Sequence, residues 1–459
     1  MTFSRRAFLG RSLAFPAMAA FSVPAGSQSA DYRALVNVYL GGGNDGVNTL
    51  VPLDAGQFAH YSRARGHLTL PRGSDPSSCL AELPGVGYGL HPSLRPLLDA
   101  WREGALAFVH NVGPLVRPTT QAELVADLNA GDLRRVPQLL YSHSDQTLLW
   151  QNGAAVVGRN VGWGGLAADQ FRGGPPVVSI AGNTRFGAGV NGGALVLAPN
   201  GQFELPGALA SGPDRQLAEV LARNVSGNAL VGLYAQKQLA AFDLSSRLSP
   251  IAALAPGAGS LPSEIGAAFA DMGNSLLSRQ LFQVAKLIHA RSVLGGQRHI
   301  FFVALNGFDT HGGQISLVPH QGVHANLLAE LSSSLLRFRR AMISLGLDAQ
   351  VTTFSTSEFG RTVAANSALG TDHVWGNLQF VLGGSVLGGR LHGDAPSLEI
   401  GGPNEAGPRG GGVGRWLPTS SVEQYATPLL RWLDPGLDLQ PLFPNLRNFA
   451  LDKLQFMRT

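Results

Sequence analysis

Three short apolar runs, each ending in a loop of glycines and acidic or histidine side chains, constrain the fold of this chain more than any other feature. The runs are residues 35–40, 299–305 and 350–355. Largely continuous apolar runs of this length are typical of strands buried on both faces in a parallel sheet. Helical patterns separate them over residues 92–103, 214–244, 262–294 and 323–345. This alternation predicts an α/β fold, with a mostly parallel central sheet and helices on both faces.

The polar residues that follow the three runs predict a ligand site. In open α/β sheets, ligands bind beyond the carboxyl ends of the strands. Asp45 follows the first run, Asp309 and His311 follow the second, and Glu358 follows the third. Glycines flank all of them and allow the backbone to approach closely. We therefore expect these side chains to share one pocket.

Carboxylates and imidazoles from separate loops are the ligands of divalent metal ions such as zinc, manganese or calcium. Several carboxylates in one pocket repel one another unless a cation compensates their charge or they share a proton. The candidate metal ligands are Asp45, Asp309, His311, Glu358, Asp372 and His373.

Two of these candidate ligands, and a serine that is a candidate nucleophile, could instead have structural roles. Glu358 could pair with Arg361 instead of a metal, and His373 could be a packed loop histidine beside Trp375. Ser142 precedes a predicted helical turn at 147–150, and this position favours a role as a helix cap. A serine at a helix start could also act as a nucleophile, because the free N–H groups there stabilise an anion.

The first 30 residues are typical of an export signal. Arg5 and Arg6 precede a weakly apolar segment at 13–23, and small residues follow at 25–30. This order resembles a twin-arginine signal peptide, which predicts passage through the twin-arginine translocase to the periplasm or medium. The apolar segment is too short for stable membrane insertion. Residues 31–459 would then form the mature domain.

Charge and cysteine content narrow the possible partners of that domain. Segment 1–30 holds three arginines and no acid, so 31 basic residues face 30 acidic ones in the remainder. This balance gives no electrostatic basis for binding nucleic acid. Cys79 is the only cysteine, so no internal disulfide forms. Two short apolar runs, 177–180 and 194–197, predict short strands and turns over residues 175–205, in a small inserted β-rich cap or hairpin.

Four blocks of sequence resemble the domain of unknown function 1501 family, a group of exported bacterial proteins in the alkaline phosphatase superfamily. The blocks are LGGGNDGVNTLVP at 40–52, SHSDQTLLWQNG at 142–153, GFDTHGGQ at 307–314, and 357–389 with SEFGRT and GTDHVWGN. The resemblance implies an alkaline-phosphatase-like fold. It also implies hydrolysis of phosphate or sulfate esters at one or two metal ions.

The resemblance also implies roles for single residues. Asp45 would be the metal carboxylate of the first strand, Asp309 and His311 a later metal pair, and His373 a late metal histidine. Ser142 would be the nucleophile, and Arg361 a further donor to the substrate. The superfamily commonly has Asp-His where Glu358 and Phe359 stand, so one ligand is missing. Cys79 lacks the motif for conversion to formylglycine.

Two functions follow as hypotheses. The first is an exported metal-dependent hydrolase that acts on a small-molecule or polymer ester of phosphate or sulfate. The second is a non-catalytic periplasmic binding or assembly protein that retains the fold.

Overall fold

The structure is a computed structural model that describes residues 31–201, 212–223, 229–406 and 412–458. The expected export signal at 1–30 lies outside the described residues. A nine-stranded sheet occupies the centre in the order β11-β5-β10-β9-β1-β8-β6-β7, and β12 pairs with β5. Its strands are β1 Arg33–Gly41, β5 Leu106–Gly113, β6 Val178–Ser179, β7 Leu195–Val196, β8 Arg298–Asn306, β9 Val351–Thr356, β10 Asn377–Leu382, β11 Arg390–His392 and β12 Ser420–Ser421.

The central strands run largely parallel. β1 pairs in parallel with β8 on one side and with β9 on the other, whereas β10 runs antiparallel to both β9 and β5. Gly41 is opposite Asn306, and Tyr39 is opposite Thr356. The carboxyl ends of the three predicted strands therefore lie side by side. The predicted α/β class with a largely parallel sheet is confirmed, and the sheet is mixed.

Helices are distributed along the described part of the chain. The α-helices are α1 Gly46–Thr49, α2 Ala55–Arg65, α3 Leu98–Arg102, α4 Gln121–Asn129, α5 His143–Asn152, α6 Trp163–Ala168, α7 Pro213–Arg223, α8 Ala229–Ala252, α9 Ser263–Phe269, α10 Leu276–His289, α11 Arg291–Leu294, α12 Val323–Ser344 and α13 Val422–Leu433. All four predicted helical patterns contain helices in the described residues, and the patterns 92–103 and 262–294 are each divided into shorter helices. No described helix is long and apolar enough to cross a membrane.

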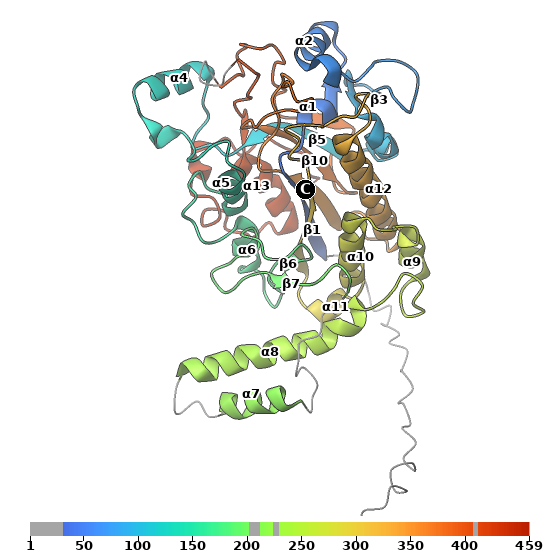
Figure 1. Cartoon of the computed structure of the whole chain (residues 1–459). Coiled ribbons are helices and arrows are strands. Elements are labelled where there is room, and N and C mark those ends of the chain that lie inside the picture. Colours follow the sequence, from blue (N-terminus) through green and yellow to red (C-terminus); the bar gives the residue numbers. More distant parts are fainter. Residues whose placement is uncertain (1–30, 202–211, 224–228, 407–411, 459) are drawn as a thin grey trace, which may run out of the picture.

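Alternate side chains of the central strands enter two separate cores. Val36 and Val38 of β1 pack in the core that α10 and α12 complete. Leu35 packs in the other core, with side chains of α6 and α13. Figure 1 shows these two pairs of helices on opposite sides of the sheet. Burying each large apolar side chain contributes about 1.5–3 kcal/mol, which holds the central strands rigidly in place.

Two smaller parts flank this body. An antiparallel sheet in the order β2-β4-β3 lies near α1 and α2, with β2 Leu50–Pro52, β3 Ala81–Leu83 and β4 Tyr88–Leu90. The helices α7 and α8 pack against each other and project away from the sheet (Figure 1).

The structure does not confirm the predicted cap at 175–205, because the strands of this segment pair with the central sheet. Val178 of β6 is opposite Phe301 of β8, and β7 is parallel to β6. Val177 and Val178 are fully buried, because they continue the apolar core beyond β8. In the described part of this segment, the strands therefore extend the edge of the central sheet and do not form a separate cap.

Candidate metal centre

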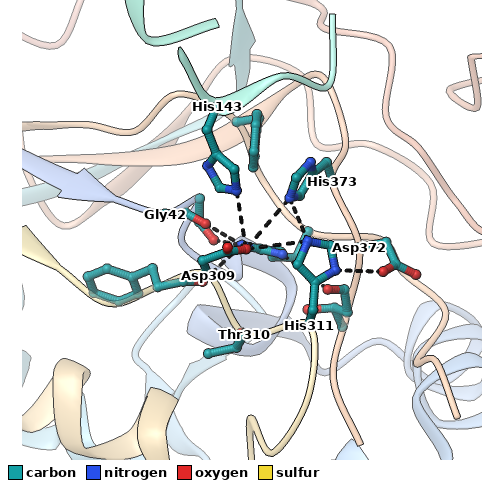
Figure 2. Close-up of polar contacts among 12 residues, drawn as sticks. Gly42, His143, Asp309, Thr310, His311, Asp372 and His373 are labelled. Atoms are coloured by element: carbon teal, nitrogen blue, oxygen red, sulfur yellow. Dashed lines mark hydrogen bonds and ion pairs between the residues drawn. The ribbon is translucent and has the colours of Figure 1, made fainter. Parts of the chain in front are cut away.

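Four side chains beyond the carboxyl ends of β1, β8 and β9 each bring one ligand atom to a common point (Figure 2). His143 is the first residue of α5, Asp309 and His311 follow β8, and His373 precedes β10. The Oδ1 atom of Asp309 lies 3.2 Å from Nε2 of His143, 3.4 Å from Nε2 of His311 and 3.6 Å from Nε2 of His373. The four ligand atoms all lie within 4.8 Å of one another. Such a group can hold a metal ion.

The other ring nitrogen of each histidine is held by an acceptor. Nδ1 of His143 lies 2.9 Å from Glu358 Oε1, and Nδ1 of His311 lies 2.8 Å from Asp372 Oδ1. Nδ1 of His373 lies 2.8 Å from the carbonyl oxygen of Tyr141. A carbonyl or an ionised carboxylate only accepts hydrogen bonds, so each Nδ1 carries the hydrogen. In the neutral rings, each Nε2 therefore has a lone pair that points to Asp309.

Apart from Arg361, which donates to Asp309 Oδ1, the centre brings together acceptors that have no donors between them. Nε2 of His311 and Nε2 of His373 are only 2.7 Å apart. Nε2 of His143 is buried and makes no hydrogen bond within the described residues. Lone pairs this close repel one another unless a cation or an added proton lies between them. Histidines whose Nδ1–H is held by a carboxylate or carbonyl are typical metal ligands.

Electrostatics set the protonation of these groups. Desolvation raises the pKa of the Asp309 carboxyl, but the hydrogen bond and charge of Arg361 outweigh it and hold that pKa at about 2. Partial burial lowers the pKa of His373, while the hydrogen bond to Glu358 raises the pKa of His143. At neutral pH, Asp309 is therefore ionised and His373 neutral, as metal ligands must be.

Two glycines allow the loops of the centre to meet. Gly42 has φ +110°, and an added Cβ there would lie 2.4 Å from the backbone nitrogen of Asp309. A Cβ on Gly370 would lie 2.3 Å from the carbonyl carbon of His311. Any side chain at either position would separate the loops, so both closely packed turns require glycine.

The start of α5 positions two of the histidines. Ser142 is the N-cap of α5 and accepts a hydrogen bond from the backbone nitrogen of Asp145. Its hydroxyl also lies 2.5 Å from Asp145 Oδ2. Tyr141 before it has φ +70°, a left-handed conformation that costs a non-glycine residue about 1–3 kcal/mol. That conformation accompanies the hydrogen bond from its carbonyl to His373. The predicted helix cap is confirmed.

Asp45 has a different environment from the one predicted. Its carboxylate is buried and pairs with Arg65 at 2.5 Å and 2.8 Å. It also caps α1 by accepting from the backbone nitrogens of Val47 and Asn48, and it accepts from Gln314 at 2.6 Å. These partners saturate both oxygens. Asp45 lies outside the group of four, and we assign it a structural role in place of metal binding.

Glu358 and Asp372 also lie outside the group of four and support its histidines from behind. Glu358 is 2% exposed and accepts from the backbone nitrogen of Gly42 as well as facing His143. The alternative ion pair between Glu358 and Arg361 is not among the ion pairs of the described chain.

Arg361 binds Asp309 instead, at 2.7 Å, and its buried guanidinium also donates to backbone carbonyls. The acceptors are the carbonyls of Gly42, Gly43, Phe308 and Thr371. With so many partners, the guanidinium fixes the loops and holds Asp309 in place. It is not a free donor for a substrate.

Phe359, which stands where the resemblance implies a histidine, forms a wall of the centre. Its buried ring lies 4.7 Å from the ring of His143 and 4.4 Å from the ring of His373, between centroids. His143, the first residue of α5, supplies a further imidazole to the centre. The sequence interpretation omitted His143 from the ligands, although the block SHSDQTLLWQNG contains it.

Comparison with known proteins places these blocks in a family. A family model described as "Protein of unknown function (DUF1501)" matches residues 32–401, well over half of the chain. The matched range includes all four residues of the candidate centre. No curated protein matches the chain.

Proposed function

We propose that this chain, which belongs to the DUF1501 family, is a metal-dependent hydrolase of a phosphate or sulfate ester. The metal site would consist of His143, Asp309, His311 and His373. One observation carries the proposal: three imidazoles, each with Nδ1 held from behind, direct Nε2 at one carboxylate oxygen. We propose zinc as the ion, because neutral imidazole and carboxylate in a compact group of four suit it.

The exposure of the centre favours catalysis over a purely structural ion. The side chains of Asp309 and His311 are 48% and 46% exposed. When bound, a divalent ion supplies a Lewis acid for an ester oxygen and lowers the pKa of a coordinated water. Solvent and substrate can therefore reach this side of the centre.

The residues around the ion hold its ligands and provide one donor. Glu358, Asp372 and the Tyr141 carbonyl fix the ring orientations. Burial and the charge of Glu358 raise the pKa of Tyr39 well above its ordinary value, so its phenol keeps its proton. Tyr39 lines the cavity beside His143, and its hydroxyl lies 2.7 Å from Thr147 Oγ1; when it accepts from Thr147, it can donate a hydrogen bond to a developing negative charge.

Export and the finer fold assignment are part of the same proposal. The paired arginines at 5 and 6 and the small residues at 25–30 support export through the twin-arginine translocase to the periplasm or medium. A ligand cluster beyond parallel strand ends supports an alkaline-phosphatase-like architecture for 31–459.

One observation favours the alternative, a non-catalytic binding or assembly protein. Four protein ligands fill a tetrahedral shell, which is usual in structural zinc sites, whereas catalytic zinc commonly has three and a water. An ion held in this way would stabilise the loops around β1 and β8 without turnover.

Metal analysis combined with ester assays tests the proposal. The purified chain is analysed for metals, dialysed against a chelator, and reloaded with zinc, manganese or calcium. Aryl phosphate monoesters, phosphate diesters and sulfate esters are then assayed. We expect about one zinc ion per chain and turnover that is lost with the chelator and restored by metal.

The double variant His311→Ala with His373→Ala is the control for metal that binds elsewhere. It should contain no zinc and have no activity at any metal concentration. Bound metal without turnover of any ester would replace the hydrolase by the binding protein. Absence of both bound metal and turnover in the folded wild type would overturn the hydrolase and leave the binding or assembly protein without a metal.

A further inference from the structure

An open groove leads away from the candidate metal centre along the carboxyl ends of β1 and β8. A cavity of about 380 Å³ borders the centre and is lined by His143, Glu358 and Gly42, among others. A second cavity of about 530 Å³ continues from it toward Arg185. The two have Tyr39, Thr147 and Asn306 in common, so they form one groove. Their size is that of a site for a small organic group.

Neutral amides and hydroxyls supply most of the polar lining of the outer cavity. Asn183 and Asn306 are exposed, and neither side chain makes a hydrogen bond within the described residues. Thr184 donates to Gln151 Oε1 at 3.0 Å, and the same oxygen accepts from the backbone nitrogen of Phe186. These contacts leave the amide hydrogens of Gln151 for a ligand. An amide both donates and accepts, which suits a partner whose hydroxyl groups do the same.

Aromatic and charged groups complete the lining. The rings of Tyr39 and Phe302 stack on each other with centroids 6.1 Å apart, so part of each ring face is already covered. This arrangement does not favour a stacked nucleobase. Among the described residues that line the outer cavity there is no carboxylate, and the one charged residue is Arg185, which donates to the carbonyl of Asn160. A cationic ligand group would therefore lack a counter-charge there.

We propose that this groove binds the alcohol part of the ester and that this alcohol is polyhydroxylated, as a sugar is. The inference rests on the proposed hydrolase function, because the groove begins at His143 of the metal centre. Asn183 and Asn306 bind hydroxyl groups of the sugar, and the covered Tyr39 and Phe302 rings form an apolar floor. The amides distinguish a sugar from an alkyl alcohol of similar size, since an alkyl chain leaves them without partners.

The preference between a sugar ester and an alkyl ester tests directly whether the groove binds a polyhydroxylated alcohol. Zinc-loaded protein is assayed with glucose 6-phosphate and hexyl phosphate, and with the corresponding sulfates. We expect a kcat/KM at least about 10-fold higher for the glucose ester, since several neutral hydrogen bonds each contribute a few-fold. In Asn183→Ala, the ratio of the two kcat/KM values should fall about 5–10-fold. Asn274→Ala, an exposed amide outside the groove, should leave the ratio unchanged.

The outcomes separate this inference from the hydrolase proposal. Equal turnover of both esters, or a ratio that Asn183→Ala leaves unchanged, overturns the sugar site while the hydrolase stands. If neither these esters nor the aryl esters are hydrolysed, the hydrolase proposal fails, and saturation-transfer NMR with glucose tests whether the groove binds a sugar. A signal that weakens in Asn183→Ala supports the sugar site, and the absence of a signal overturns it.

Discussion

Asp45 and Asp309 both follow the carboxyl end of a central strand, yet their surroundings are opposite. The carboxylate of Asp45 is fully buried, and Arg65, Gln314 and two backbone nitrogens satisfy it. The carboxylate of Asp309 is 48% exposed, and its Oδ1 faces three imidazole nitrogens as well as Arg361. Asp45 is surrounded by donors, whereas Asp309 has Arg361 as its one side-chain donor and otherwise faces imidazole acceptors.

This difference separates a structural carboxylate from a candidate ligand. A buried carboxylate with a bidentate arginine needs no metal, because its charge and its lone pairs already have partners. A carboxylate that faces histidine lone pairs as well as one arginine gains further partners when a metal cation or protons enter. Position at a strand end is therefore insufficient evidence for metal binding, and the type of neighbour decides.

Loss of the Asp45 charge should have the largest effect on stability. Asp45→Asn leaves Arg65 buried without a counter-charge, so we expect a loss of about 3–5 kcal/mol in the free energy of unfolding. Chemical denaturation at pH 7 measures it. Asp54→Asn, an exposed helix cap on α2, should cost no more than about 1 kcal/mol. A small loss in Asp45→Asn would remove the contrast between the two carboxylates.

The same carboxylate makes stability depend on pH. Burial raises the pKa of Asp45, but the charge and hydrogen bond of Arg65 outweigh it and lower the pKa from 3.8 to about 2. Because the folded pKa is below the unfolded one, this stabilisation is present above about pH 4 and is lost as the pH falls toward 2. Melting temperatures measured across that pH range should depend less steeply on pH in Asp45→Asn than in the wild type.

Removal of His143 should lower the affinity for zinc at least about 100-fold. Loss of a supporting residue alone costs about 10–100-fold, and His143 would be a direct ligand. Competition with a chromophoric chelator measures the affinity of His143→Ala. His67→Ala, an exposed histidine before β3, is the control and should bind zinc normally. Unchanged affinity in His143→Ala would reduce the centre to the three residues already expected from the sequence.

Removal of Asp372 should have a smaller effect on the same measurement. Its carboxylate holds Nδ1 of His311, so Asp372→Ala should weaken zinc binding about 10–100-fold. Because it acts through His311, the double variant with His311→Ala should bind no more weakly than His311→Ala alone. Additive losses would mean that Asp372 contacts the metal itself, as the sequence interpretation had it.

The sequence predicted the central part of this arrangement because local patterns determine it. The apolar runs of β1, β8 and β9 gave the parallel strands, and the polar loops after them brought Asp309, His311 and His373 together. The Asp45–Arg65 pair was not predictable, since Arg65 is on a polar helix with no motif that links it to the site. β6 and β7 are only two residues each, too short for a pattern to show which sheet they join.

The smallest expected effect concerns Ser142, whose two interpretations differ in what they would change. As the N-cap of α5, Ser142 contributes about 1 kcal/mol, and Ser142→Ala should lose about that much stability. Its hydroxyl hydrogen has a partner in Asp145, on the same helix turn. We therefore expect Ser142→Ala to keep its zinc and most of its kcat.

A nucleophile behaves differently, because its loss removes most of the rate while the fold and the metal remain. Zinc content, the free energy of unfolding and kcat of Ser142→Ala are measured on one preparation. Ser142→Thr adds a control, since threonine keeps the hydroxyl and caps a helix almost as well. If Ser142→Ala keeps zinc and stability but loses its turnover, Ser142 is the nucleophile implied by the family resemblance. Ser142 and Asp45 would then differ clearly. Both cap a helix, but Ser142 would also react with the substrate, whereas Asp45 would have a structural role alone.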